Sequence, residues 1–345
     1  ERIVPEADQE IAPGGVLSPG WIDLRAHLTD PGTEYKESLA TLAAAAAHGG
    51  FTSVVPLPNA QPVLDHAGPI TSLLHRAHDL PVRVLPTGAL SEGAQGVDLA
   101  ELYDMSQAGA VAFTDGAYPT SNTGLLLRGL QYLKAFDGLL LDFPLENSLR
   151  RSAEVAEGEV ATRLGMHGLP ELAETMAVDR ALQVMAYFPG RLHLGPLTTA
   201  NAVDRIAAAK SELEPLSASV SALHLLLSDA AIEGFDPNTK LWPPLRTDTD
   251  RQRLLAGVAK GEIDCIVSNH APQSIEEKRH DFQTAHTGAS TLDHAVSAAW
   301  TALAASGNGL DKLIAGLKVG PRRVQGLQEA NNAEGEFMAQ TWFDP

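Results

Sequence analysis

The chain has 345 residues, of which 44% are hydrophobic and 20% are charged, and its formal net charge is −18 at pH 7. This composition is typical of a folded globular protein and excludes a largely disordered chain. The negative charge repels phosphate backbones and anionic lipid surfaces, so we expect no nucleic acid and no membrane among its partners.

The lengths of the apolar runs and the number of cysteines indicate where in the cell the protein is found. The longest apolar runs, such as 39–47, fall well short of the roughly 18 to 20 apolar residues that a membrane span requires. The single cysteine, Cys265, lies in an apolar stretch and can form neither an internal disulfide nor a thiolate metal cage. We predict that Cys265 is a core residue and that the protein is cytoplasmic. Because the sequence starts at Glu1 without an initiator methionine, we expect terminal segments to be missing.

Short β-branched stretches alternate along the chain with longer alanine- and leucine-rich stretches of helical period, which is the pattern of repeated βα units. The predicted strands, buried on both faces, are 21–24, 53–57, 82–87, 110–114, 138–142, 191–194, 216–220 and 265–268. The predicted helices between them are 39–48, 69–78, 99–108, 123–135, 171–187, 200–211 and 248–260.

Eight strands with seven helical crossovers predict an α/β fold, a (β/α)₈ TIM-type barrel, whose reactive groups lie at the carboxyl ends of the strands. An open doubly wound sheet would want a glycine-rich phosphate turn after the first strand. Here that strand runs instead into Arg25-Ala26-His27. We therefore predict a barrel over 19–318, with 1–18 and 319–345 forming a small, partly missing β-sandwich layer outside it.

The segment 18–62 reads SPGWIDLRAHLTDPGTEYKESLATLAAAAAHGGFTSVVPLPNAQP and closely resembles the opening of dihydroorotases of the amidohydrolase superfamily. Four later segments resemble motifs of the same family in the same order: 113–116, 168–174, 240–246 and 268–272. One such match is a weak signal, whereas five ordered matches through most of the chain make the resemblance specific.

The resemblance implies a barrel of the metal-dependent hydrolase kind and chemistry on a cyclic amide. In that family one or two metal ions, usually zinc, activate a water that opens the ring of dihydroorotate, and the reverse reaction forms the ring. The metal lowers the pKa of the water to about 7 and polarises the carbonyl. Such an ion needs several imidazoles and carboxylates that converge at the strand ends.

Most positions that match the family's metal ligands carry other residues. The His-x-His pair of the first strand matches Arg25 and His27, so that a permanent cation replaces the first imidazole. The imidazoles of the fifth and sixth strands match Pro144 and Pro196. The carboxylate of the eighth strand matches Asn269, which cannot take up a proton at neutral pH.

Of the implied ligand set only His27 and Asp115 remain, and two ligands do not make a catalytic zinc site. The arginine that grips the substrate carboxylate in active relatives matches Thr29. The positions matching the family's substrate contacts, Asn59 and His270, would then be vestigial, and we predict no metal.

Arg25 and His27 also have plainer interpretations, which stay open. Arg25 could pair with Asp115 or Glu146 as an ordinary partly buried arginine, or its charge could stand in for the absent metal. His27 without its imidazole neighbour is more often a hydrogen-bonded structural histidine than a ligand.

The remaining vestigial positions have structural interpretations too. Asn59 follows Pro58, as turn residues commonly do. Asn269 and His270 could simply end a strand by bonding to nearby backbone.

These observations predict a dihydroorotase-like pseudoenzyme: a non-catalytic structural or regulatory subunit of pyrimidine biosynthesis, without a cofactor. The resemblance implies the catalytic subunit of aspartate transcarbamoylase as its partner, and we expect a homodimer. The alternative is an active dihydroorotase or related cyclic amidohydrolase with a reduced or absent metal site, in which Asp115, Glu146, His27 and His270 share the acid and base work. A third hypothesis is a sensor that binds a small molecule in the vestigial pocket.

Overall fold

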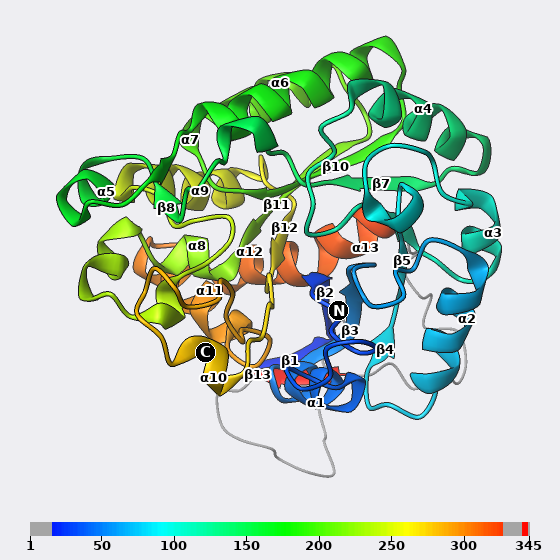
Figure 1. The fold of residues 1–345 in the computed structure, drawn as a ribbon, viewed down its shortest axis with the longest axis horizontal. Helices are drawn as coiled ribbons and strands as arrows, with labels where there is room; N and C mark the ends of the chain where they lie inside the picture. The colour runs from blue at the N-terminus through cyan, green and yellow to red at the C-terminus, as the bar shows by residue number, and fades with distance from the viewer. Residues whose placement is uncertain (1–15, 327–339, 344–345) are drawn as a thin grey trace, which may run out of the picture.

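The computed structural model describes residues 16–326 and 340–343, and its strands form a barrel that helices surround (Figure 1). The barrel strands are β2 (Trp21–Ala26), β3 (Phe51–Pro56), β4 (Arg83–Val84) continued by β5 (Thr87–Gly88), β6 (Ala112–Phe113), β7 (Leu139–Asp142), β10 (Arg191–Leu197), β11 (Leu216–Ser221) and β12 (Cys265–Val267). All their pairings are parallel, and the order runs β2-β3-β4 and then β5-β6-β7-β10-β11-β12.

Two connections close the ring of strands. A parallel bridge joins Ala26 at the end of β2 to His270 beyond the end of β12. Between β4 and β5 the chain continues through Leu85 and Pro86, and Pro86 has no N–H to donate to a neighbouring strand. The predicted barrel is therefore confirmed, while the single strand predicted over 82–87 is broken into two.

Seven helices lie where helices were predicted: α1 (Leu39–His48), α2 (Ala67–Arg76), α3 (Leu102–Gln107), α4 (Thr123–Leu133), α6 (Leu172–Tyr187), α7 (Ala200–Ala209) and α9 (Asp248–Lys260). The bounds of α1 and α9 match the prediction because strong local signals fix their ends. The Ser38 side chain caps α1, and its partner in a capping box is Thr41. Thr247 caps the start of α9, and Gly261 in the left-handed conformation ends it.

Further elements lie outside the predicted barrel strands and the seven predicted crossover helices. The helices among them are α5 (Glu159–Leu164), α8 (Ala222–Leu226), α10 (Ile275–Lys278), α11 (Ala295–Ala305), α12 (Leu310–Ile314) and α13 (Gly320–Gln325), with a π-helical turn at Ala315–Val319. Short 3₁₀ turns lie at Glu92–Ala94, Lys134–Phe136, Asn147–Leu149, Asp229–Gly234 and Pro237–Thr239, and a small parallel pair joins β8 (Val155–Ala156) to β9 (Gly168–Leu169). Helix α13 packs against β2, so this part of the predicted 319–345 layer belongs to the barrel.

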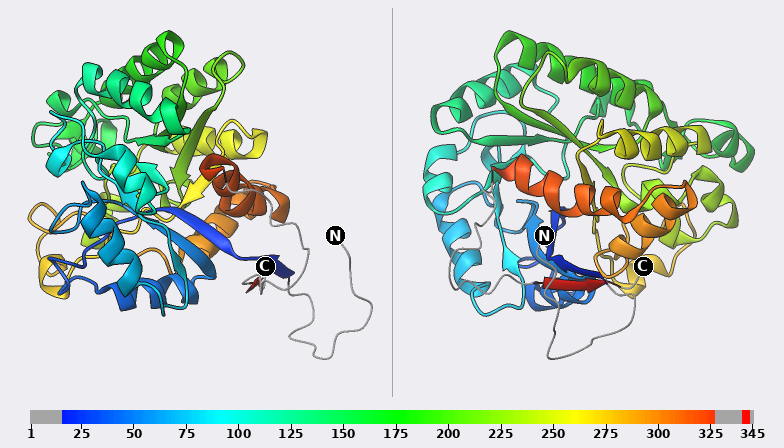
Figure 2. Two further views of the ribbon diagram at one scale, coloured as in Figure 1. Left: turned by 90° about the vertical axis from the view of Figure 1, so that its right-hand side faces the viewer. Right: turned by 180° about the vertical axis from the view of Figure 1, so that it is seen from behind.

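The two ends of the chain meet beside the barrel. β1 (Val16–Pro19) pairs antiparallel with β13 (Gln340–Phe343) in a two-stranded ribbon (Figure 2). The rest of the predicted β-sandwich layer falls on 1–15, 327–339 and 344–345, outside the described residues. None of the described helices is long and apolar enough to cross a membrane.

The apolar core has two shells, as a barrel requires. Alternate strand residues such as Ile22, Leu24 and Leu139 fill the interior, where Cys265 is buried as predicted. Their neighbours along the strands face outward and pack against the surrounding helices, as Leu140 does. A rigid, filled barrel of this kind holds the side chains at its strand ends in fixed positions.

Candidate functional site

Arg25 is the central side chain at the carboxyl end of the barrel. It lies near the end of β2 and is only 7% exposed. Its Nε donates to Oδ1 of Asn269 at 3.0 Å, and its Nη2 donates to the carbonyl oxygen of Gly116 at 3.3 Å. The guanidinium carbon lies 5.0 Å from the ring centroid of Phe143, just after β7. Burial lowers the pKa of Arg25 to about 10, so the side chain remains a cation at neutral pH.

The predicted acidic partners of Arg25 are bonded elsewhere, which corrects that prediction. The carboxylate of Asp115 accepts hydrogen bonds from the backbone N and the hydroxyl of Ser91, at 2.8 and 2.7 Å. Glu146 forms an ion pair with Arg180 at 3.3 Å. Asp115 is thus bonded to the loop that carries Ser91, and Glu146 is bonded to helix α6, which carries Arg180.

Asp23 is the acidic group whose charge acts on Arg25, and it too is bonded elsewhere. It accepts from the backbone N and the hydroxyl of Ser268, both at 2.7 Å, and so ties β2 to the end of β12. Burial raises the pKa of Asp23 to about 6, although the Ser268 bonds oppose that rise. Within the described residues, no carboxylate forms an ion pair with Arg25.

Asn269, at the position of the family's carboxylate, joins two parts of the site. Its Oδ1 accepts from Arg25, and its Nδ2 donates to the carbonyl oxygen of Trp242 at 2.9 Å. Its φ of 51° lies in the left-handed region, which asparagine tolerates better than most residues but at a cost on the order of 1 kcal/mol. The two side-chain bonds hold the strained residue in place.

A second arginine lies near the same loop. The guanidinium carbon of Arg150 lies 4.0 Å from the ring centroid of Trp242. The Arg150 side chain is half-buried, and burial lowers its pKa. Sequence reasoning did not single out either residue, because no local pattern joins positions so far apart in the chain.

His27 is the one imidazole of the family's ligand set that remains. Its side chain is partly exposed, and its backbone N donates to the carbonyl oxygen of His270 at 2.8 Å. Burial first, and then the nearby charges of Arg25, His270 and Lys36, lower the pKa of His27 to about 3. The ring is therefore neutral at physiological pH.

Both ring nitrogens of His270 are bonded to the protein. Nδ1 accepts from the backbone N of Thr291 at 2.9 Å and of Leu292 at 3.2 Å, so the proton must lie on Nε2. Nε2 donates to the carboxylate of Glu37 at 3.0 Å. The side chain is fully buried and joins three loops, so its substrate role stays a prediction that this geometry does not support.

Asn59 fixes the turn after β6. Its Nδ2 donates to the carbonyl oxygen of Asp115 at 3.0 Å, and its Oδ1 accepts from the backbone N of Ala117 at 2.8 Å. Between them Gly116 has a φ of 70°, and a Cβ there would lie 1.9 Å from Oδ1 of Asn59. Only glycine fits this turn, whose carbonyl accepts from Arg25. A vestigial substrate contact by Asn59 stays a prediction.

These residues do not fit a zinc ion. No cluster of three or more histidine, cysteine, aspartate or glutamate side chains able to hold a metal is found in the described part of the chain. Pro144 and Pro196 offer no side-chain lone pair, and the guanidinium of Arg25 repels a cation. With Asp115 held by Ser91, His27 is left without a second ligand.

Asp142 at the end of β7 is a buried carboxyl that sequence reasoning missed. Neither of its oxygens accepts a well-formed hydrogen bond from a described residue, and Thr120 is the polar group beside it. Burial raises its pKa to about 6, the charge of Arg180 lowers it, and that of Asp115 raises it further. An aspartate that ends an apolar strand resembles an ordinary turn residue, so no sequence signal marked it.

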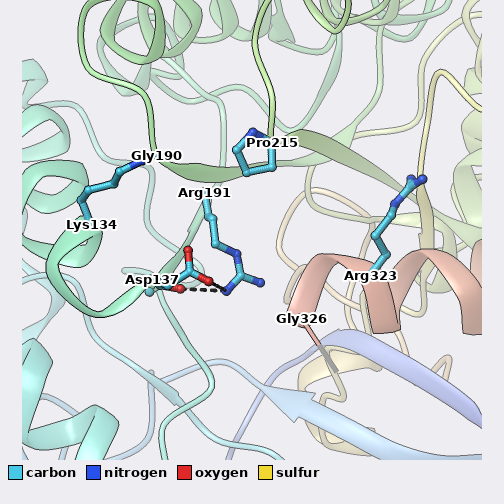
Figure 3. Close-up of a pocket in the computed structure, with 8 residues that line it drawn as sticks. Lys134, Asp137, Gly190, Arg191, Pro215, Arg323 and Gly326 are labelled. Carbon is cyan, nitrogen blue, oxygen red and sulfur yellow. Dashed lines mark hydrogen bonds and ion pairs between the residues drawn. The ribbon is translucent and has the colours of Figure 1, made fainter. Parts of the chain in front are cut away.

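The cavity in Figure 3 lies at the opposite end of the barrel, where β7, β10 and β11 begin. Its volume is about 320 Å³, and its lining includes Asp137, Arg191 and Arg323. Arg191 forms an ion pair with Asp137 at 3.2 Å and donates to the carbonyl oxygen of Val324 at 2.8 Å. Its position separates it from the candidate site.

Comparison with known proteins places these observations in a family. Residues 14–191 match the family described as "Dihydro-orotase-like". A protein named dihydroorotase from Pelotomaculum thermopropionicum is 37% identical over 336 residues, which cover 97% of this chain and 78% of that protein. One of the same name from Desulfotalea psychrophila is 40% identical over 275 residues, which cover 80% of this chain and 65% of that protein. The solved structure of an L-hydantoinase (dihydropyrimidinase) from Arthrobacter aurescens has a TM-score of 0.80 at 22% identity and covers 92% of this chain and 73% of that one, which shows the fold.

These relatives contradict two predictions. The pseudoenzyme prediction is wrong, because proteins named dihydroorotase match nearly the whole chain. The prediction of no cofactor is contradicted as well, because the relatives carry the names of a family whose chemistry uses a metal ion, even though the described residues of this chain do not form a zinc site. Both predictions rested on substituted ligand positions alone, and a changed ligand set describes one part of a pocket rather than the activity of the whole protein.

Proposed function

Because this chain belongs to the dihydroorotase-like family, we propose that it is a cyclic amidohydrolase that opens the ring of dihydroorotate or closes it from carbamoyl aspartate. The observation that carries this proposal is the 37% identity to a protein named dihydroorotase over 97% of the chain. The reaction adds water across a ring amide, so the site must hold an anionic ring and stabilise negative charge on the carbonyl oxygen.

The carboxyl end of the barrel offers groups suited to that task. Arg25 is a buried cation with no carboxylate partner among the described residues, and a guanidinium can bind a carboxylate or a developing oxyanion through two parallel donors. Thr29, at the position of the family's substrate arginine, bonds to the carbonyl oxygen of Glu37 instead. Arg25 is therefore the best-placed group for the substrate's charge.

The acid and base work needs a different assignment from the one predicted. Asp115, Glu146 and His270 are all bonded to protein partners. His27 is partly exposed and neutral, and it can orient a water or a ring N–H through hydrogen bonds. Because the residues do not fit a zinc ion, no step is assigned to a metal.

An assay in both directions tests the proposal. The purified protein is incubated with dihydroorotate and with carbamoyl aspartate, as isolated, after chelation, and with added zinc, and ring opening is followed by ultraviolet absorbance. We expect turnover that Arg25→Met abolishes and that the control Arg151→Gln, which removes an exposed arginine, leaves unchanged. Absence of turnover of both compounds under all three metal conditions would overturn the proposal.

The predicted partners remain proposals that rest on resemblance. Association with the catalytic subunit of aspartate transcarbamoylase and a homodimer are tested by sedimentation of the protein alone and mixed with that subunit. A sedimenting species of one chain under both conditions would contradict both. The cytoplasmic location stays a prediction.

A further inference from the structure

We propose that Arg25 and Arg150 together form a binding site for a ligand with two carboxylates, at the end of the barrel where the family's metal ligands have been replaced. The inference rests on the proposed function for the class of the ligand. It assigns that ligand to a pair of guanidinium groups rather than to a metal ion, and binding can be measured whether or not the protein turns the ligand over.

The first half of the site is the unbalanced charge of Arg25. This side chain is only 7% exposed, and both its hydrogen bonds go to neutral oxygens, on Asn269 and Gly116. A buried cation attracts an anion strongly, because the low local dielectric weakens screening. Neutral acceptors do not cancel that charge, and the nearby carboxylate of Asp23 is bonded to Ser268, so the carboxylate of a ligand is the group that would pair with it.

The second half is Arg150, whose guanidinium carbon lies 4.0 Å from the centroid of the Trp242 ring, a cation–π contact. No hydrogen bond or ion pair of its guanidinium is found with the described residues, and burial lowers its pKa. The indole nitrogen of Trp242 is also buried without a hydrogen-bond partner in the described part of the chain. An arginine so placed keeps its donors available for a ligand.

Asn269 and an aromatic cluster join the two halves. The amide of Asn269 bonds to Arg25 on one side and to the carbonyl of Trp242 on the other. Phe143, under Arg25, and Trp242, under Arg150, pack into the same small apolar cluster. The Asn269 amide therefore connects Arg25 to the residue on which Arg150 lies, and the rings beside the two cations belong to one apolar cluster.

The charges select the class of ligand. Two guanidinium groups suit two planar carboxylates, each of which can accept parallel hydrogen bonds. The overall charge of −18 repels anions from most of the protein, so a tight anion site has to be local and built from side chains such as these. A dicarboxylate with a short carbon skeleton, such as carbamoyl aspartate or succinate, fits this description better than a monocarboxylate.

Calorimetry at low ionic strength tests the site, with carbamoyl aspartate, succinate, dihydroorotate, acetate and inorganic phosphate as probes. We expect the two dicarboxylates to bind at least about tenfold more tightly than the two monocarboxylates, as one extra charge-assisted contact predicts. Equal affinity for dicarboxylates and monocarboxylates, or phosphate binding as tightly as succinate, would overturn the proposal. Binding without turnover would instead overturn only the proposed function.

Three variants distinguish the role of the two arginines in binding from any role in folding. Arg150→Gln should lower the affinity for dicarboxylates about tenfold and leave monocarboxylates unchanged, whereas the matched control Arg151→Gln should change neither. Asn269→Asp keeps the shape of the side chain and gives Arg25 a carboxylate partner, so it should abolish binding of all the carboxylates while the protein stays folded. Wild-type affinity for dicarboxylates in Arg150→Gln, or wild-type affinity for any of the carboxylates in folded Asn269→Asp, would disprove the site.

Discussion

The two ends of the barrel treat buried charge in opposite ways. At the amino end, the buried carboxylate of Asp264 pairs with Lys210 at 2.5 Å and with Arg323, and it accepts from the backbone N of Ala218 at 2.8 Å. At the carboxyl end, the buried cation of Arg25 has only neutral acceptors. Charge at the amino end is thus balanced by direct ion pairs, whereas Arg25 at the carboxyl end has no ion pair among the described residues and feels the charge of Asp23 only from beyond ion-pair distance.

This difference indicates that the amino end of the barrel serves stability and that the carboxyl end serves function. A buried charge that is paired and hydrogen-bonded costs little, whereas an unpaired one costs several kcal/mol unless something neutralises it. In barrels of this type the amino end contributes stability, and the carboxyl end carries the chemistry. The strained Asn269 and the unbonded carboxyl of Asp142 lie at the carboxyl end too, so unfavourable features gather where a ligand is expected to bind.

The largest expected effect is at the amino end. Asp264→Ala removes the acceptor that two cations and a backbone N–H share, and it should lower the free energy of unfolding by about 3 to 4 kcal/mol in urea denaturation. The control Arg323→Ala should cost less than about 1 kcal/mol, because that side chain is 68% exposed. Equal costs for the two variants would show that the balance at this end does not depend on Asp264.

Asp142→Asn, at the carboxyl end, should raise the free energy of unfolding rather than lower it. The pKa of Asp142 is raised from 3.8 to about 6 in the folded protein, so its contribution to stability is present below pH 3.8 and is lost as the pH rises through 6. Removing the charge should therefore stabilise the protein by up to about 3 kcal/mol above pH 6 and have no effect below pH 4. Thermal unfolding across pH 4 to 8 measures this. A gain that does not depend on pH would rule out ionisation as its cause.

The sequence alone was enough to predict the barrel and the ends of some of its helices. The alternation of strands and helices predicted the barrel, and the caps Ser38 and Thr247 fixed the starts of two helices. Helix α11 escaped prediction because its alanine-rich sequence has only Ser297 and Thr301 to mark its exposed face, and two small hydroxyl side chains reveal a helical period weakly. Residues at family positions, such as Arg25, were identified from the resemblance.

Their bonding partners were not predicted, because a side chain just after a strand takes its direction from the nearest donor, whether a loop or a helix supplies it. Ser91 draws Asp115 away from Arg25 in this way, and Arg180 draws Glu146. The pairing of Arg150 with Trp242 joins positions about ninety residues apart in the sequence, beyond the reach of any local pattern. Tertiary contacts of this kind decide what the site can bind.

Arg25→Met tests the unbalanced charge directly. Methionine has a similar length and no charge, so the variant should unfold with a free energy about 1 to 2 kcal/mol higher than the wild type when no ligand is present. The gain should shrink when succinate is added, because the ligand stabilises only the protein that binds it. Measurement is by urea denaturation with and without succinate. A variant clearly less stable than the wild type would mean that the hydrogen bonds of Arg25 outweigh its desolvation.

The smallest expected effect concerns Arg150. Arg150→Gln removes a cation–π contact at a half-buried position, so it should lower the free energy of unfolding by no more than about 1 kcal/mol. The free energy of unfolding and the affinity for dicarboxylates are measured in the same variant. A small loss of stability together with a tenfold loss of affinity would sharpen the contrast between the two ends of the barrel. Asp264 at the amino end acts on stability, whereas Arg150 at the carboxyl end acts on binding. If Arg150→Gln instead destabilised the protein as much as Asp264→Ala does, Arg150 would be part of the scaffold, and the division between the two ends would not hold.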